Sequence, residues 1–350
     1  ILREDKDLSA DHFEKDKDIF LSWINENPVG HRNGWEPYPL SLRIVNWIFY
    51  YNKYQTAFAK DEEFNTVFLN SLYRQCAYLS HFLEMHIRAN HLFKNGKAML
   101  FGGFFFREHK WITIGQGIID AELDEQILSD GGHFEHSPMY NSLILEDIID
   151  LASLVNESKT NNEPITFQRL HDISQKMLKW LYSTIHPDGE IPLFGDSSLK
   201  SALAFDQLYH YHHQIFNELP DTKYPEYIDE LKESGYSIFR SSDQFLIMDC
   251  GQLGVDYQPG HAHCDMLSYE YSYNNKRFIV DTGIGEYLNT DIRHRARSIV
   301  AHNCVVVNNM DQAEIWQTFR MGRRVSAPLV NREVKGDVIK LCASYNNVRS

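Results

Sequence analysis

The sequence predicts a multidomain α and β protein, with a helical part followed by a part built of antiparallel β-strands. Apolar residues recur at helical spacing through about the first two-thirds of the 350 residues. Short β-rich runs separated by polar turns fill the rest. Because strands and helices do not alternate, two separate units are expected, covering residues 1–225 and 235–350.

The helical part contains eight segments whose apolar residues repeat with the period of a helix. In the longest of them Phe64, Phe68, Leu72, Leu79 and Leu83 share one face. Turn-forming clusters such as Asp130-Gly131-Gly132 and Pro187-Asp188-Gly189 mark several joints between segments. The expected helices span residues 11–25, 37–54, 61–88, 90–100, 113–128, 138–155, 166–185 and 205–216.

The residue pattern changes near residues 220–225, and from residue 236 onward short strand-like runs dominate. Turns such as Asn274-Asn275-Lys276 separate them, which is typical of a meander or sandwich of antiparallel strands. The expected strands span residues 236–240, 245–250, 267–273, 277–281, 304–307, 325–330 and 338–343.

Composition narrows the possible functions. The formal net charge of −14 argues against general binding to nucleic acid or to an anionic membrane surface. No apolar run approaches the length of a membrane span. The five cysteines show no short paired spacing, so neither a disulfide framework nor a zinc finger is expected. Because the sequence begins at Ile1 and stops in strand-like sequence at Ser350, we expect it to be part of a longer protein.

The stretch Gly260-His261-Ala262-His263-Cys264-Asp265 offers the first candidate site. In an extended chain alternate side chains share a face, so His261, His263 and Asp265 could point together toward a metal or a substrate. Alone, a His-x-His pair is more often just two polar residues at the end of a strand.

Further candidates stand in loops and at the ends of expected elements. Asn90-His91 opens a helix, where the pair is either a functional group or an N-cap and its neighbour. The glycine-containing loop from Asp130 to Ser137 runs into the helix that carries Tyr140. Asp281 ends one strand and His302 precedes another. Together with His263 they form a set of two imidazoles and a carboxylate that suits zinc.

A basic cluster lies close to these residues in the sequence. Its members are Arg293, His294, Arg295, Arg297, Arg320, Arg323 and Arg324. In so acidic a chain this clustering indicates either a place for an anion or a solvated face.

Taken together, these motifs resemble the heparinase II/III-like polysaccharide lyases and the related alginate lyases. The resemblance rests on Asn90-His91, on the run from Gly131 to Tyr140, on the run from Gly260 to Asp265, on Asp281-Thr282-Gly283, and on Arg297-Ser298 through His302-Asn303. Order and approximate spacing both match, and the motifs cover nearly the whole chain. The resemblance implies an incomplete α/α toroid followed by an antiparallel β-sheet (sandwich) domain, and cleavage of uronic-acid-containing polysaccharides by β-elimination.

The resemblance also implies roles for individual residues. Asn90, with His91, would neutralise the uronate carboxylate, while Tyr140 and His261 would supply acid and base. His136 is a secondary candidate for contact with substrate. Residues matching His263, Asp281 and His302 would hold zinc, with a structural role favoured, and no organic cofactor is expected. Arg293 and Arg297 would bind anionic groups of the sugar chain. Each of Trp35, Tyr38 and Trp316 is either a sugar platform or an aromatic residue of the core.

The acidic charge favours a lightly charged uronate polymer, such as a bacterial exopolysaccharide, over heavily sulfated heparin. Two other functions are compatible with parts of the pattern. A metal-dependent hydrolase of the His-x-His-x-Asp kind would want histidine where Met266 stands. A non-catalytic polysaccharide-binding protein of surface polysaccharide assembly would keep the scaffold without turnover. The resemblance favours a periplasmic or secreted location over a cytoplasmic one, and the sequence does not indicate an oligomeric state.

Overall fold

A computed structural model describes residues 10–158, 165–218, 227–335 and 338–346. The change of residue pattern noted near residues 220–225 lies outside these ranges. By the density of contacts the chain divides into two compact units, one of residues 1–124 and 151–167 and one of residues 125–150 and 168–350. The expected division at residues 225–235 stays a prediction, because the second unit contains helices as well as all the described strands. Each unit is considered by itself below.

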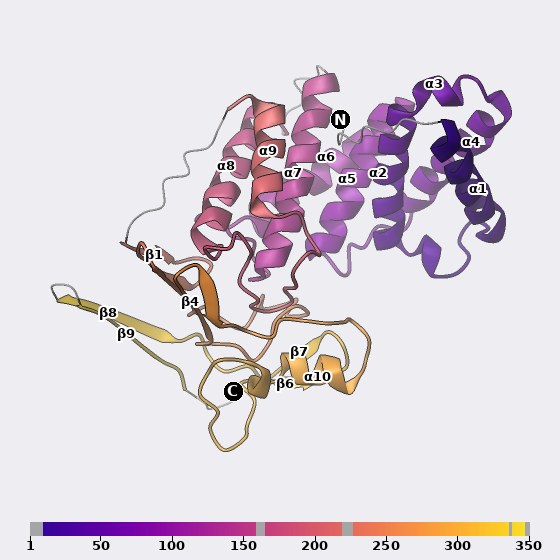
Figure 1. Cartoon of the computed structure of the whole chain (residues 1–350). Helices are drawn as coiled ribbons and strands as arrows, with labels where there is room; N and C mark the ends of the chain where they lie inside the picture. Colours follow the sequence, from indigo (N-terminus) through magenta and orange to yellow (C-terminus); the bar gives the residue numbers. More distant parts are fainter. Residues whose placement is uncertain (1–9, 159–164, 219–226, 336–337, 347–350) are drawn as a thin grey trace. The chain divides into compact units, whose positions relative to one another are not determined.

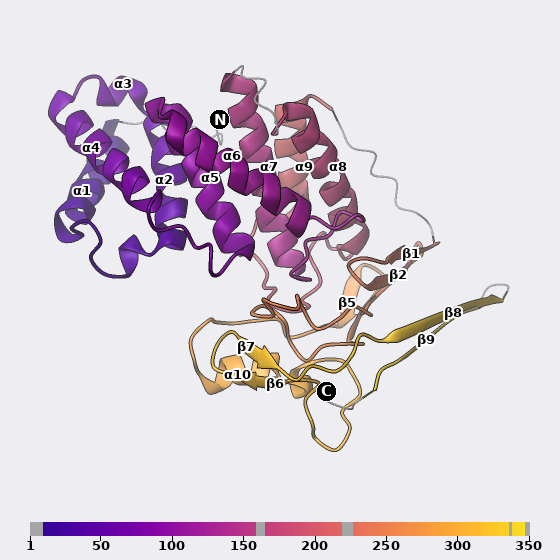
Figure 2. The ribbon, with the colours of Figure 1, turned by 180° about the vertical axis from the view of Figure 1, so that it is seen from behind.

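The first unit is helical. Its elements are α1 (Ala10–Glu26), the 3₁₀ turn η1 (Asn33–Trp35), α2 (Pro37–Lys53), α3 (Gln55–Phe58), α4 (Glu62–Leu79), α5 (Ala89–Phe106) and α6 (His109–Gln126). Helix α2 packs against α4 and α5, as Figures 1 and 2 show from opposite sides. The interior is aromatic, with Phe58, Phe64 and Phe68 buried and in ring contact with one another.

Helix α4 begins and ends at positions that local hydrogen bonds explain. The Asp61 carboxylate accepts from the backbone N–H of Phe64 at 3.0 Å and caps the first turn. The sequence predicts that this helix continues to residue 88, but it ends at Leu79. Buried Glu84 instead holds an irregular turn, because its backbone N–H donates to Asn95 Oδ1 at 2.8 Å and its carboxylate accepts from Asn95 Nδ2 at 2.9 Å. The periodicity of residues 80–88 was therefore misleading.

The second unit combines helices with β-sheet. Helix α7 (Pro138–Ser158) starts in this unit and is followed by α8 (Phe167–Thr184) and α9 (Phe205–Phe216). Strands β1 (Tyr227–Leu231), β2 (Tyr236–Arg240), β3 (Gln244–Asp249), β4 (Tyr269–Tyr273) and β5 (Lys276–Ile279) then form one antiparallel meander in sequence order. Trp180 of α8 contacts this sheet through Tyr236, with ring centroids 5.7 Å apart. The predicted order of helices followed by antiparallel strands is confirmed, whereas the toroid and the sandwich stay predictions.

The rest of the second unit carries short elements. They are α10 (Asp291–Arg297), the 3₁₀ turn η2 (Ile299–Ala301), and two hairpins formed by β6 (Glu314–Trp316) with β7 (Arg320–Gly322) and by β8 (Leu329–Lys335) with β9 (Val338–Ser344). The sequence missed α10, β1, β6 and β7. Strands β6 and β7 have only three residues each, too few for an alternating pattern to be detected. Helix α10 is capped by Thr290, whose side chain accepts from the backbone N–H of Arg293.

Two expected strands differ from the structure. Residues 304–307 do not form a strand, since Asn308 and Asn309 have positive φ and close a local turn in which the Met310 N–H donates to the Val307 carbonyl. The strand expected at residues 325–330 starts only at Leu329 and continues to Lys335, paired with β9. The described part of the chain contains no helix with the length and apolar character needed to cross a bilayer.

Candidate active site

The Tyr140 ring lies against the His261 ring within the second unit. Their centroids are 4.0 Å apart and the planes are inclined by 33°. Tyr140 belongs to the first turn of α7, which begins at Pro138 after Ser137. The Tyr140 N–H donates to Ser137 Oγ at 3.4 Å, so Ser137 caps the helix and proline occupies its first position. The loop-to-helix junction read from the sequence therefore fixes where the phenol lies.

Ionisable side chains surround this pair. His261 Nε2 lies 3.5 Å from Glu135 Oε2, and His261 Nδ1–H donates to Asp196 Oδ2 at 2.7 Å. Burial lowers the pKa of His261, but Glu135 and Asp196 outweigh burial and raise it above its usual value. The Tyr140 hydroxyl lies 3.2 Å from the Tyr287 hydroxyl. Burial, followed by Tyr287, raises the pKa of Tyr140, so this side chain is a neutral phenol that can donate a proton.

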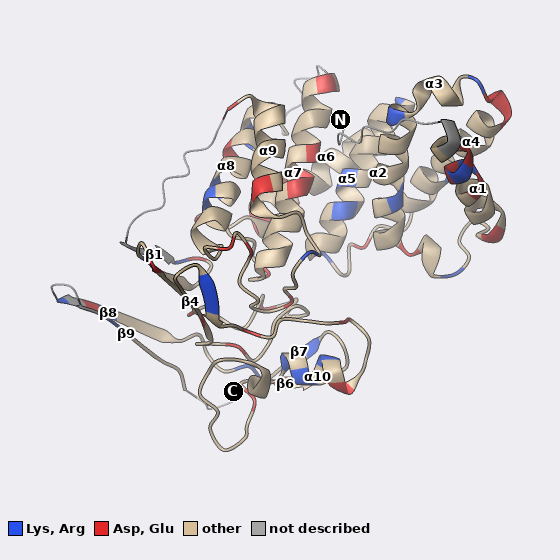
Figure 3. Cartoon of the chain, viewed as in Figure 1, with Lys and Arg blue, Asp and Glu red and all other residues tan. Residues whose placement is uncertain are grey.

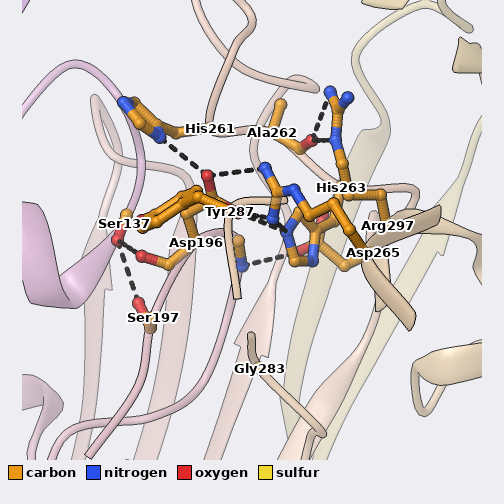
Figure 4. A network of polar contacts seen from close by, with 12 residues as sticks. Ser137, Asp196, Ser197, His261, Ala262, His263, Asp265, Gly283, Tyr287 and Arg297 are labelled. Atoms are coloured by element: carbon orange, nitrogen blue, oxygen red, sulfur yellow. Dashed lines mark hydrogen bonds and ion pairs between the residues drawn. The ribbon is translucent and has the colours of Figure 1, made fainter. Parts of the chain in front are cut away.

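Asp196 was not predicted from the sequence, yet it joins the two histidines of the His-x-His stretch. Its Oδ1 accepts from His263 Nε2–H at 2.7 Å, while Oδ2 accepts from His261. Figure 4 shows the carboxylate between the two imidazoles. Burial alone would raise the pKa of Asp196, but the hydrogen bonds from both histidines hold it well below its usual range. The available sequence signal was the polar glycine-containing run Phe194-Gly195-Asp196-Ser197.

A candidate metal site lies beside this network. One ligand atom from each of His263, Asp265 and His302 falls within 4.8 Å of the others, and all three residues are buried. His263 Nδ1 and His302 Nε2 are buried and have no hydrogen-bond partner in the described structure. Buried imidazole nitrogens without partners are unfavourable unless they bind something, so the donor set fits a cation such as zinc.

Asp281 takes a different position from the one predicted for it. Both of its carboxylate oxygens lie 2.9 Å from His302 Nδ1, the ring nitrogen opposite the buried Nε2 that has no hydrogen-bond partner among the described residues. Asp265 occupies the cluster position expected for Asp281. The geometry therefore favours Asp281 as the residue that orients His302, an arrangement common behind metal-bound histidines.

The basic cluster separates into buried and exposed members. Arg293 is 1% exposed and donates to both oxygens of Asp196; Arg297 is 0% exposed and donates to backbone carbonyls, including that of Ala262 at 3.1 Å. These placements do not favour the predicted contact of Arg293 and Arg297 with substrate. The exposed arginines of the cluster are Arg295, Arg320 and Arg323, and Figure 3 shows basic residues at α10 and β7.

The first unit holds the other predicted pair, Asn90 and His91, at the start of α5. His91 Nδ1 lies 2.9 Å from Glu84 Oε1, and its ring lies over Tyr38 with centroids 4.4 Å apart. Arg88 and Ala89, just before Asn90, both have positive φ, a strained conformation for residues other than glycine. Such local strain is frequent at functional sites, because the surrounding structure is used to hold particular groups in place.

The remaining predicted substrate contacts differ in exposure. Trp35 is 4% exposed, with its ring against Trp23, and its Nε1–H donates to the Asn27 carbonyl at 3.2 Å. This core position does not favour a sugar platform. Trp316, on β6, is 46% exposed and keeps that prediction open. His136 has a positive φ, and its Nδ1–H donates to the Ser234 carbonyl at 3.0 Å.

Two family models together match residues 16–348. One, described as heparinase II/III N-terminus, covers residues 16–224, and the other, heparinase II/III-like, C-terminal, covers residues 224–348. The chain belongs to the heparinase II/III-like family. The resemblance noted from the sequence motifs is thereby confirmed.

Proteins named heparin-sulfate lyase are among the relatives of this family member. The one from Bacteroides stercoris is 25% identical over 354 residues, covering 85% of this chain and 51% of the relative. The one from Pedobacter heparinus is 24% identical over 321 residues, covering 83% and 47%. The chain therefore spans about half the length of the curated relatives it matches.

Solved structures of the family share the fold. A crystal structure of heparinase III superposes with a TM-score of 0.76 at 17% identity, covering 93% of this chain and 54% of that one. A heparan sulfate lyase from Pedobacter heparinus gives 0.65 at 19% identity, covering 97% and 55%. These likenesses confirm the predicted fold class and leave the roles of individual residues as predictions.

Proposed function

We propose that the chain carries the catalytic centre of a polysaccharide lyase that cleaves a uronic-acid-containing chain by β-elimination. The contact between the Tyr140 phenol and the His261 imidazole carries the proposal. It joins a proton donor and a proton acceptor from distant parts of the sequence, flanked by Glu135 and Tyr287. Family membership and the names of the relatives support it.

The reaction needs three functions, and this chain has side chains for each. A base takes the proton from C5 of the uronate, and the C5–H electron pair is held as an enolate delocalised onto the carboxylate. This pair then forms the C4=C5 double bond as the C4–O bond breaks, and an acid protonates the departing oxygen. His261 Nε2 is the proposed base, since Nδ1 carries the hydrogen given to Asp196. Tyr140, a neutral phenol because its pKa is raised, is the proposed acid.

The negative charge that builds up on the uronate must be stabilised. By family resemblance Asn90, with His91, donates to the sugar carboxylate and spreads this charge. Glu84 orients the His91 ring by accepting a hydrogen bond from its Nδ1. The exposed residues Arg295 and Arg320 are proposed to hold further anionic groups of the sugar chain.

We also propose that His263 Nδ1 and His302 Nε2 hold a zinc ion with Asp265, and that Asp281 supports them. Two ring nitrogens, which are buried and have no hydrogen-bond partner among the described residues, support this assignment. When bound, the ion would offset the buried negative charge of Asp265 and Asp281 and fix the segments that carry His261. No organic cofactor is proposed.

The proposed substrate is a uronate polymer of low to moderate charge. The relatives' names point to heparan-type chains, while the net charge of −14 provides little attraction for a densely sulfated chain. A periplasmic or secreted location stays a prediction, which fractionation of the native host would test. The alternative function, a metal-dependent hydrolase, is not supported, because the chain has the fold of heparinase III.

The test is an activity panel. Purified protein is incubated with heparan sulfate, heparin, alginate and unsulfated uronate exopolysaccharides, and ultraviolet absorbance of the unsaturated product is followed. A signal on heparan sulfate or an unsulfated polymer, exceeding that on heparin, is expected. Sugar binding by calorimetry with no product on any polymer, beside an active lyase as control, would favour the non-catalytic binding protein instead.

A further inference from the structure

Asp196 lies at the centre of the polar network of the second unit, in the segment between α8 and α9. Its side chain is fully buried and accepts four hydrogen bonds. Two come from His261 Nδ1–H and His263 Nε2–H, each at 2.7 Å. The other two come from the Arg293 guanidinium, which donates Nη2–H to Oδ2 at 2.8 Å and Nη1–H to Oδ1. A carboxylate offers about four acceptor sites, so this one is saturated.

Arg293 holds this carboxylate in place. It is buried, it contacts both oxygens, and its Nε–H donates to the Thr318 carbonyl at 3.2 Å. The rings of Tyr287 and Phe319 lie 5.2 and 5.6 Å from the guanidinium carbon. A planar guanidinium bound to both oxygens of a carboxylate is a rigid pairing. Arg293 thus serves Asp196, which explains why its predicted role as a contact for substrate is not supported.

An ionised carboxylate can only accept hydrogen bonds, and this determines where the imidazole hydrogens lie. His261 must carry hydrogen on Nδ1, and His263 must carry it on Nε2. In the neutral rings the lone pairs then fall on the opposite atoms. His261 Nε2 lies on the side of Glu135, and His263 Nδ1 is the buried nitrogen without a partner in the described structure.

Hydrogen bonds connect the backbone around Asp196 to His261, Ser137 and Asp265. The Asp196 N–H donates to the His261 carbonyl at 3.0 Å, and its own carbonyl accepts from Ser137 Oγ at 2.8 Å. The neighbouring Gly195 N–H donates to Asp265 Oδ2 at 2.7 Å. Ser137 caps the helix of Tyr140, and Asp265 belongs to the metal cluster. A shift of the Asp196 segment would therefore disturb both sites.

We propose that Asp196 is a positioning residue that sets the tautomers of His261 and His263 together. By keeping the hydrogens on the ring nitrogens that it contacts, this carboxylate places the lone pair of His261 on Nε2, the proposed base of the lyase site. It also places the lone pair of His263 on Nδ1, the proposed metal ligand. The part concerning His261 as a base rests on the proposed lyase function, whereas the tautomers and the metal ligand do not. Loss of Asp196 would weaken catalysis and metal binding in parallel, although Asp196 is not one of the residues proposed to contact the sugar or to hold the metal.

The primary measurement needs no variant. Protein labelled with ¹⁵N-histidine is studied by long-range ¹H–¹⁵N correlation, which distinguishes the protonated ring nitrogen from the bare one. His261→Gln and His263→Gln assign the signals. We expect hydrogen on Nδ1 in His261 and on Nε2 in His263. Hydrogen on Nδ1 of neutral His263, in protein freed of metal, would overturn the proposal.

The variant Asp196→Asn tests the consequence. An amide of the same shape has one acceptor oxygen and one donor nitrogen, so it cannot accept from both imidazoles. One ring must change tautomer or lose its bond. We expect kcat to fall roughly 10- to 100-fold with KM little changed, and affinity for zinc, measured against a chelator, to fall by a similar factor.

Glu270→Gln is the matched control. Glu270 is also fully buried, with its Oε2 3.0 Å from His186 Nε2 and 3.3 Å from Arg277 Nη1, but it contacts neither His261 nor His263. We expect a comparable loss of thermal stability with kcat, zinc affinity and the two tautomers unchanged. Equal loss of kcat and zinc affinity in both variants would show a general effect of instability and refute the positioning role. A protein without lyase activity but with the expected tautomers and zinc loss would refute only the proposed lyase function.

Discussion

Tyr140 and His261, 121 residues apart in the sequence, lie in ring contact inside one compact unit, with centroids 4.0 Å apart and planes inclined by 33°. Tyr140 is held by the start of α7, and His261 is held by the buried carboxylate of Asp196. Each ring is thus positioned by a hydrogen bond to a buried group. The proposed proton transfers depend on such positioning, because small displacements of the reacting groups cost large factors in rate.

Replacing the phenol tests its role as the acid. Tyr140→Phe keeps the ring in contact with His261 and removes the hydroxyl near Tyr287, so we expect kcat to fall by about 100-fold or more while thermal stability changes little. Tyr211→Phe, which removes a hydroxyl that donates to Asp150 at 2.6 Å, should keep full activity. Turnover above a tenth of the unmodified rate in Tyr140→Phe, measured by product absorbance, would rule out the phenol as the essential acid.

The amide of Asn90 is expected to stabilise charge in the transition state. Asn90→Ala should lower kcat roughly 100- to 1,000-fold, the usual effect of removing one such donor. Asn27→Ala removes an amide that donates to the Trp23 carbonyl at 2.9 Å in the same unit, and serves as control. If the Asn90 variant changes only thermal stability, to the same extent as Asn27→Ala, the amide has a structural role and the lyase assignment loses one of its three functions.

Metal analysis tests the cluster of imidazoles. Protein purified without chelator should contain about one equivalent of zinc. Chelation should lower the unfolding temperature, because a ligand that binds the folded state stabilises it. His302→Ala should abolish both the zinc content and the effect of chelator, whereas His186→Ala, which removes a buried imidazole bonded to Ser272 Oγ at 2.7 Å, should keep both. An unchanged unfolding temperature after complete removal of metal would contradict a structural zinc.

The glycine before Asp196 offers a test of local geometry. Gly195 has φ +55°, and a Cβ added there would meet the His261 carbonyl oxygen at 3.1 Å. Gly195→Ala should cost about 1–2 kcal/mol of stability from the left-handed backbone and should also lower kcat by displacing Asp196 or His261. Gly189→Ala has a similar backbone strain (φ +86°) but open space around the added atom, so it should lose stability with kcat intact. Identical kcat in the two variants would show that the site tolerates the displacement.

Acid should destabilise the second unit through His133. Burial lowers the pKa of this fully buried imidazole from 6.5 to about 4. Between these values the unfolded chain binds the proton and the folded chain does not, so stability falls as pH decreases from about 6.5 to about 4. In His133→Gln the new amide can still donate to Gln126 Oε1, which lies 2.9 Å from His133 Nε2, but it has no group that titrates. Its stability should depend less on pH, by up to about 3 kcal/mol over this range; equal slopes in denaturant titrations of both proteins would contradict the assignment.

The sequence determined the order of helices and antiparallel strands, because periodicity and turn residues are local properties. It also marked His261, His263 and His302 as candidate site residues, and the family resemblance added Tyr140. It failed where a local pattern was overruled by distant groups. The helix expected to reach residue 88 ends at Leu79 because Glu84 bonds to Asn95.

Only the tertiary structure decided which partners these residues have. Asp196 stands in an ordinary polar turn, and nothing in its neighbours in the chain shows that four donors converge on it. The same holds for the exchange of Asp281 for Asp265 at the metal cluster and for the burial of Arg293. Side-chain chemistry can be read from a sequence, but the hydrogen bonds that assign a role to it depend on segments brought together by folding.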